Sequence, residues 1–171
     1  MSDKDISWVA SERFREIIKE SNPFFEEYAE IMEELTELKI PSSVSTKTLI
    51  NPKKMFKECD SQLDSLKKRI NNLDMQFLDW HKRATKVYAE PNFPVGLKDK
   101  KTELFFHIQQ NFILHRMSQL SDALRTLYSS INTKTDELQN RMDNAHSINL
   151  FAYSIIVAWV LFILSNVIKF G

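Results

Sequence analysis

A run of twenty-one residues without a charged side chain, from Ile148 to Ile168, constrains this 171-residue chain more than any other feature. As an α-helix rising about 1.5 Å per residue, the run measures roughly 31 Å, which matches a hydrocarbon core of about 30 Å. The run is apolar around its whole circumference, whereas a surface helix of a soluble domain is apolar along one stripe. We therefore expect residues 148–168 to form a transmembrane helix. The residues taken to represent this span are Ile148, Phe151, Ile155, Trp159, Phe162 and Ile168.

The three residues after this run set the expected topology. Only Lys169, Phe170 and Gly171 follow it, and a ribosome still holds a longer piece of chain when translation ends, so we expect a tail-anchored protein inserted after translation. Residues 1–147 would then face the cytosol. A single basic residue after a long apolar run favours the endoplasmic reticulum, or a membrane derived from it, over the mitochondrial outer membrane.

The composition limits the fold classes that are possible for the rest of the chain. Only 2 Gly and 5 Pro are present, which excludes sheets with tight turns and glycine-rich phosphate loops, because both need residues that tolerate positive φ. Basic and acidic residues number 23 each, and this balance argues against a nucleic-acid-binding protein. The sequence predicts an all-α protein, an elongated helical bundle or coiled-coil hairpin with a C-terminal transmembrane helix.

Prolines and a polar stretch divide the chain into four expected regions. Acidic helices occupy residues 1–40, a Ser/Thr-rich loop follows at 41–52, an antiparallel helical hairpin covers 53–147, and the anchor is 148–168. Within the first region, Ser21-Asn22-Pro23 interrupts the helical pattern, since Asn caps helices and Pro fits their first position.

The hairpin is expected from two apolar stripes, in residues 53–89 and 98–140, whose members are spaced by three and four. A short connection between two helices places them side by side and antiparallel, so the stripes would meet. Pairing of the same stripes between two chains stays open. The core residues expected on the two helices are Leu63, Leu66, Ile70, Leu73, Phe77, Trp80, Met117, Leu120, Leu124, Leu127 and Ile131.

Charge indicates where the acidic helices dock. Residues 16–39 contain eight Glu against two Lys, and residues 53–88 contain nine Lys or Arg against five Asp or Glu. Opposite signs favour contact between these segments, although each exposed pair contributes only about 0–1 kcal/mol.

Residues that could carry catalysis are sparse. The four histidines, His81, His107, His115 and His146, lack the spacing of two metal ligands on one helical face. The single cysteine, Cys59, falls at an apolar stripe position, where a thiol is an inert packing residue. We expect no enzyme activity, no cofactor, no metal site and no small-molecule substrate.

Three aromatic residues exceed what the hairpin needs. Phe105, Phe106 and Phe112 broaden the apolar face near the start of the second helix, so we expect them to contact partner proteins. The resulting hypothesis is a helical module held at a membrane, which binds the bilayer and other helical proteins as a tether, adaptor or assembly subunit.

The alternative is a divergent membrane-fusion protein of vesicle transport. From Ile113 to Leu138 the stripe resembles the membrane-proximal half of a SNARE motif, and Gln110 would be its central polar layer. This resemblance covers about forty residues and implies assembly with three further SNARE helices. Two features depart from the motif: Pro91, Pro94 and Gly96 interrupt its upstream half, and Lys134 occupies a core position.

Overall fold

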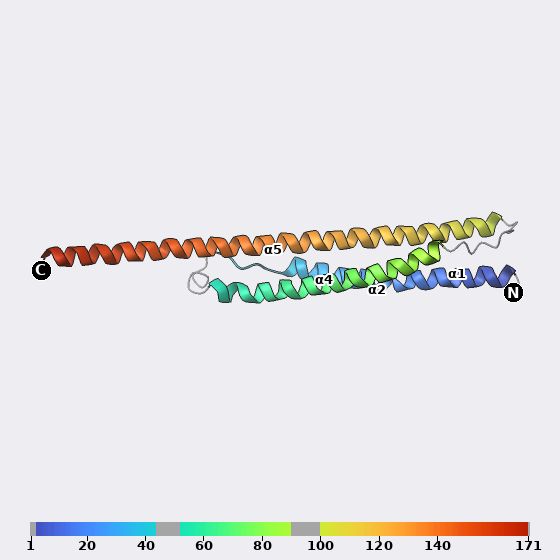
Figure 1. Cartoon of the computed structure of the whole chain (residues 1–171), viewed down its shortest axis with the longest axis horizontal. Coiled ribbons are helices and arrows are strands. Elements are labelled where there is room, and N and C mark those ends of the chain that lie inside the picture. Colours follow the sequence, from blue (N-terminus) through green and yellow to red (C-terminus); the bar gives the residue numbers. More distant parts are fainter. Residues whose placement is uncertain (1–2, 44–51, 90–99, 171) are drawn as a thin grey trace. The chain divides into compact units, whose positions relative to one another are not determined.

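The computed structural model describes residues 3–43, 52–89 and 100–170, and all regular structure among them is helical. The helices are α1 (Asp3–Glu20), α2 (Asn22–Glu37), α4 (Pro52–Ala89) and α5 (Lys100–Phe170) (Figure 1). The all-α prediction is confirmed, and α5 continues without interruption into the apolar run. Most of the expected Ser/Thr loop and the proline-rich break at 90–97 lie outside the described residues.

The junction between α1 and α2 forms at the expected interruption. Ser21 N donates to Ile18 O at 3.1 Å, one residue short of the α-helical partner, and Ser21 Oγ donates to the same carbonyl at 2.6 Å. This tightened turn leaves the Ile17 carbonyl without its usual donor. The indole Nε1 of Trp80, which is fully buried, supplies one at 2.9 Å. The junction is therefore completed by a side chain from α4.

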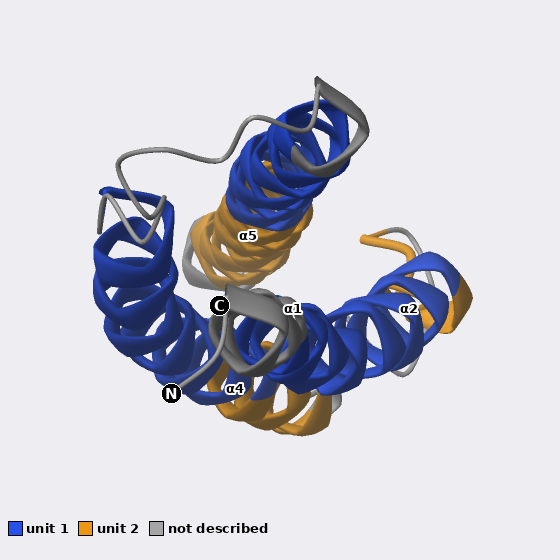
Figure 2. Cartoon of the chain, turned by 90° about the vertical axis from the view of Figure 1, so that its right-hand side faces the viewer, with its two compact units in different colours: residues 1–36, 66–130 blue, residues 37–65, 131–171 orange. Residues whose placement is uncertain are grey.

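The chain divides into two compact units (Figure 2). Unit 1 comprises residues 1–36 and 66–130, and unit 2 comprises residues 37–65 and 131–171. Because α4 and α5 are long, each contributes residues to both units.

Unit 1 has a core drawn from four helices, α1, α2, α4 and α5. Its buried side chains recur every three or four residues, which is the spacing of one helical face. They are Phe14, Ile17, Phe24, Ile31 and Leu35 from α1 and α2; Leu66, Ile70, Leu73, Phe77, Trp80 and Ala84 from α4; and Phe106, Ile113, Met117, Leu120, Leu124 and Leu127 from α5.

Polar contacts give the direction of the helices in unit 1. Gln110 of α5 donates to Tyr88 O of α4, and farther along α5 the Tyr128 hydroxyl lies 3.1 Å from Asp74 Oδ2. Residue numbers thus fall along α4 as they rise along α5, so the two helices run antiparallel. Burial, together with this contact to Asp74, raises the pKa of Tyr128.

The acidic helices dock against α4 through two arginines. Arg69 Nε donates to Glu27 at 2.8 Å, and its guanidinium also pairs with Glu30 and Glu34. Arg83 Nη1 pairs with Glu20 at 2.6 Å. The hydrogen bond that Arg69 donates to Glu27 is the largest factor that raises the pKa of Arg69. These pairs lie where the opposite charges of the two segments are expected to meet.

Unit 2 contains a smaller apolar core. Its buried side chains are Ile40, Phe56, Cys59, Leu63, Ile131, Leu138 and Ala145. Lys134, which interrupts the apolar spacing, is half-buried, and its Nζ donates to Leu38 O at 3.1 Å. Arg141 Nη1 donates to Ile40 O at 2.8 Å. Both cations therefore satisfy carbonyls just beyond the end of α2, where a helix lacks its own donors.

The apolar spacing of α4 predicts different effects for two leucines on the same helix. Leu73 is 4% exposed and Leu78 is 50% exposed. Leu73→Ala should lower the free energy of unfolding by about 2–5 kcal/mol, because it removes buried methyl groups and leaves a cavity. Leu78→Ala should cost less than about 0.5 kcal/mol. Urea unfolding of the detergent-solubilised chain, followed by circular dichroism, measures both; equal losses would contradict the assigned face.

Lys134→Leu tests whether Lys134 weakens the apolar stripe of α5 or stabilises the protein by capping the Leu38 carbonyl. If apolar spacing alone governed stability, leucine would increase it. We expect a loss of about 1–3 kcal/mol, since Leu38 O loses a charged donor in a half-buried site. Amide exchange in residues 36–41 should accelerate in this variant and not in Asn132→Leu, an exposed control two residues away. A more stable Lys134→Leu protein would contradict the capping role.

Candidate membrane anchor and partner-binding face

The C-terminal part of α5 carries the most exposed apolar surface. Among the described residues, α5 is the one helix with a stretch long and apolar enough to cross a membrane, and none of that stretch is buried. Phe151 is 68% exposed, Trp159 63% and Leu161 60%. Exposed apolar surface of this extent on every side of a helix requires cover from outside the chain.

The two serines within this stretch donate hydrogen bonds to carbonyls of the same helix. Ser154 Oγ donates to Phe151 O at 2.7 Å, and Ser165 Oγ donates to Phe162 O at 2.9 Å. Both hydroxyls can therefore enter a hydrocarbon layer without a lost hydrogen bond. Of the residues taken to represent the span, Phe151, Ile155, Trp159 and Phe162 are exposed, Ile148 is half-buried, and the side chain of Ile168 lies outside the described residues.

A second exposed apolar surface lies at the start of α5. We call it the amino-terminal patch; it consists of Leu104, Phe105, Ile108 and Phe112, which are 60%, 44%, 55% and 47% exposed. Spacings of three and four residues place these side chains along one side of the helix. Phe105 and Phe112 thus lie on the surface, as a partner contact requires.

Phe106 differs from this expectation. It is only 3% exposed, and its ring centroid lies 6.3 Å from that of Phe14 in α1. The reason is helical geometry: Phe106 is seven residues before Ile113 and shares its core-facing side. Sequence spacing alone grouped it with its neighbour Phe105, although adjacent helical residues face different directions.

Arg116 borders the amino-terminal patch. Its Cζ lies 4.9 Å from the ring centroid of Phe25 in α2 and 5.9 Å from that of Phe112. A guanidinium over an aromatic ring is attracted by the ring's quadrupole, by about 0.5–1 kcal/mol at exposed sites. The spacing of the apolar stripe does not predict this contact, because it carries no information about polar residues beside the stripe.

Gln110 is half-buried and makes a contact within its own chain. Its Nε2 donates to Tyr88 O at 3.3 Å, in the last turn of α4. Carbonyls in that turn have no donor from the helix. The side chain therefore acts as a cap for α4 in this structure.

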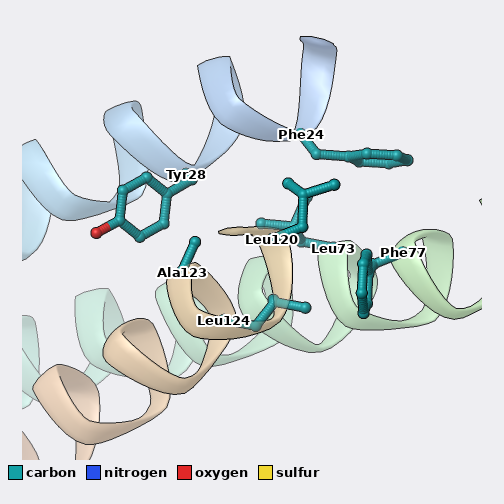
Figure 3. A pocket seen from close by; sticks show the side chains of 7 residues that line it. All are labelled: Phe24, Tyr28, Leu73, Phe77, Leu120, Ala123 and Leu124. Atoms are coloured by element: carbon teal, nitrogen blue, oxygen red, sulfur yellow. The ribbon is translucent and has the colours of Figure 1, made fainter. Parts of the chain in front are cut away.

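A cavity in unit 1 bears on small-molecule binding. Seven side chains from α2, α4 and α5 converge on it (Figure 3): Phe24, Tyr28, Leu73, Phe77, Leu120, Ala123 and Leu124. Its volume is about 10 Å³, at the lower limit for one water molecule, whereas ligand sites measure roughly 300–1,000 Å³. The cavity is a packing gap and not a ligand site.

Groups suited to metal binding are not brought together in the described part of the chain. No cluster of three or more His, Cys, Asp or Glu side chains there could hold a metal ion. Cys59 is buried, and this burial raises the pKa of its thiol, with Asp60 and Glu137 acting in the same direction and Lys134 opposing. The thiolate needed for nucleophilic chemistry is thereby disfavoured.

Comparison of the chain with models of protein families, with curated proteins and with solved structures gives no match. Function is therefore inferred from the geometry of the two exposed apolar surfaces.

Because burial raises the pKa of the Cys59 thiol, we predict a loss of folding stability at alkaline pH. A folded-state pKa above the unfolded value of about 8.5 means that folding favours the protonated thiol, so stability is full below that pH and falls as pH rises through the folded pKa. Urea unfolding at a series of pH values from neutral upward should show this fall. Cys59→Ala should reduce its slope. A native Cys59 that reacts with a maleimide as fast as free cysteine would contradict the burial.

Proposed function

We propose that the protein is a membrane-anchored helical interaction module. Residues 148–168 hold it in a bilayer, and residues 1–147 bind other helical proteins as a tether, adaptor or membrane-complex assembly subunit. One observation carries the proposal: along the continuous helix α5, the spaced apolar residues up to Ala145 are covered by the chain itself, while the apolar stretch that follows has no cover.

The orientation and compartment are part of the same proposal. Residues 1–147 face the cytosol, and the membrane is the endoplasmic reticulum or one derived from it. Support comes from the long apolar run and its few basic neighbours, Arg141 before it and Lys169 after it.

The amino-terminal patch is the proposed partner-binding face. Phe105 and Phe112 are large aromatic side chains of the kind that dominates binding energy at interfaces. Together with Leu104 and Ile108, they form an apolar side of a helix, which suits contact with a partner helix. The antiparallel packing of α4 and α5 supports a self-contained domain, in which the core stripes are not available to partners.

In the membrane-fusion alternative, the apolar stripe of α5 would have to separate from the helices of its own chain that cover it. That rearrangement would expose Ile113, Leu120 and Leu127, which are at most 3% exposed here, and would release Gln110 from Tyr88. No contact in the described residues favours this second state. The interaction module is therefore the function that we propose, and the variants below separate the two.

Charges in the middle of the apolar stretch should prevent anchoring. Val157→Arg with Leu161→Arg should abolish resistance to carbonate extraction from microsomes, because each arginine costs about 2.5–3.5 kcal/mol near the bilayer centre. Val157→Leu with Leu161→Val is the matched control and should remain integral.

Protease added to the same intact microsomes tests the orientation. It should digest residues 1–147 of the wild-type chain. A native chain that carbonate extracts, or an amino-terminal tag that protease cannot reach, would contradict the anchor or its orientation respectively.

Loss of the amino-terminal patch should abolish partner binding without unfolding the domain. Phe105→Ala with Phe112→Ala should reduce co-purification of partners from mild detergent by about thirtyfold or more, the effect of losing 2 kcal/mol at an interface. Met75→Ala with Leu78→Ala, which truncates exposed side chains of α4, is the matched control and should retain binding.

Gln110→Ala distinguishes the two functions. The interaction module predicts nearly unchanged partner recovery. Loss of function from Gln110→Ala alone, together with a detergent-resistant complex containing three SNARE helices, would favour membrane fusion instead.

A further inference from the structure

Among the side chains that the structure describes, three arginines are half-buried: Arg69, Arg116 and Arg141. Arg69 pairs with glutamates of α2, and Arg141 pairs with Glu137 at 2.6 Å. Arg116 differs from both, since no described residue forms a hydrogen bond or an ion pair with it. A charge that is partly removed from water is costly unless an acceptor compensates it. Arg116 is therefore the half-buried arginine whose charge the described chain does not match.

Two aromatic rings hold the Arg116 side chain in place. Its Cζ lies over the ring of Phe25 in α2, at 4.9 Å from the centroid, and over that of Phe112 in α5, at 5.9 Å. The rings attract the cation but offer no oxygen acceptor, so the N–H donors of the guanidinium stay available. Because two helices position the group before a partner arrives, less side-chain freedom is lost on binding.

The charges around Arg116 supply no acidic partner. From residue 104 to residue 121, α5 contains no acidic residue. Glu26, which follows Phe25 in α2, is exposed, and no ion pair joins it to Arg116 in the described structure. The end of the amino-terminal patch at Phe112 therefore carries a positive charge that can attract an anionic group from outside the chain.

The opposite end of the amino-terminal patch has a different charge. Glu103 precedes Leu104, and Glu103 Oε1 lies 3.9 Å from His107 Nε2. A carboxylate at this end repels a second carboxylate, whereas Arg116 at the other end attracts one. The exposed apolar side chains of the patch thus lie between two ends that a charged ligand can distinguish.

We propose that the amino-terminal patch binds an amphipathic helix of a partner protein whose apolar stripe ends in a carboxylate, and that this carboxylate pairs with Arg116. This inference rests on the proposed partner-binding face and names the chemistry of the partner. A guanidinium can bind a carboxylate through parallel hydrogen bonds to both of its oxygens, so the pair sets direction as well as affinity. The partner helix would lie with its acidic end at Phe112 and its other end at Leu104.

A displayed library of helical peptides serves as the probe for this inference. Each peptide carries Leu or Phe at positions spaced by three and four, and the residues that flank both ends of this stripe are randomised. The target is the full chain in nanodiscs of phosphatidylcholine, which contain no anionic lipid that could compete for Arg116. Selected peptides should be enriched in Asp or Glu at one end of the stripe and not at the other.

Variants of Arg116 show whether this enrichment depends on the guanidinium. Selection on Arg116→Gln should lose the acidic preference, and selection on Arg116→Glu should reverse it to Lys or Arg, which partial unfolding could not produce. Arg125→Gln changes an exposed arginine farther along α5, so it is the matched control and should keep the preference.

Affinity measurements with one selected peptide give the size of the effect. Replacing its acidic residue by the corresponding amide should weaken binding to the native chain about tenfold, because a hydrogen bond between charged groups is lost. The same replacement should change binding to Arg116→Gln much less.

The outcomes separate this inference from the partner-binding face itself. Peptides that need Phe105 and Phe112 but show no acidic preference would overturn the inference and leave the face intact. An acidic preference that persists in Arg116→Gln would also overturn the inference. If no selected peptide depends on Phe105 and Phe112, both proposals fail. Self-association of the chain in place of peptide binding, lost in Arg116→Glu, would overturn the inference in favour of a second copy as the occupant.

Discussion

The arrangement of this protein depends on how the apolar surface of one helix, α5, is covered. From Phe106 to Ala145 its spaced apolar side chains are buried against helices of the same chain. Beyond that point the spacing gives way to apolar residues on all sides, and a stripe-to-stripe contact could no longer cover them. The same helix therefore has a covered part and an uncovered part. The proposed functions follow from this difference, since the covered part forms a domain and the uncovered part is the proposed bilayer anchor.

Hydrogen bonds to backbone carbonyls at helix ends explain the positions of several side chains that apolar spacing does not explain. Trp80 completes the tightened turn at Ile17, Gln110 caps Tyr88, and Lys134 reaches Leu38. In each case a donor from one helix satisfies a carbonyl near the end of another, at a net value of about 0.5–3 kcal/mol. These bonds specify which helix ends meet, whereas apolar contacts alone would tolerate a shift along the stripe.

The sequence was sufficient for the helices and for the core, because both depend on local periodicity and helix-breaking residues. The expected core, from Leu63 to Ile131, is buried, and the α1–α2 junction falls at Ser21. Two kinds of feature could not be predicted from the sequence. Phe106 was grouped with exposed neighbours because proximity in sequence does not give direction, and Lys134 was seen only as an interruption because its acceptor is distant in sequence. Partner and compartment depend on surfaces outside the chain, which local periodicity does not encode.

The central claim is that the stripes of α4 and α5 pair within one chain. Asp74→Cys and Tyr128→Cys, on a Cys59→Ala background, place thiols at a contact between the two helices. Unlabelled and nitrogen-15-labelled chains are unfolded together, refolded, reconstituted in vesicles and treated with a short dithiol crosslinker. Mass spectrometry then reads the isotopes of the α4–α5 crosslinked peptides. Pairing within the chain predicts crosslinks in which both peptides carry the same isotope. A statistical mixture of labelled with unlabelled peptides would show that the stripes pair between chains and would contradict the account.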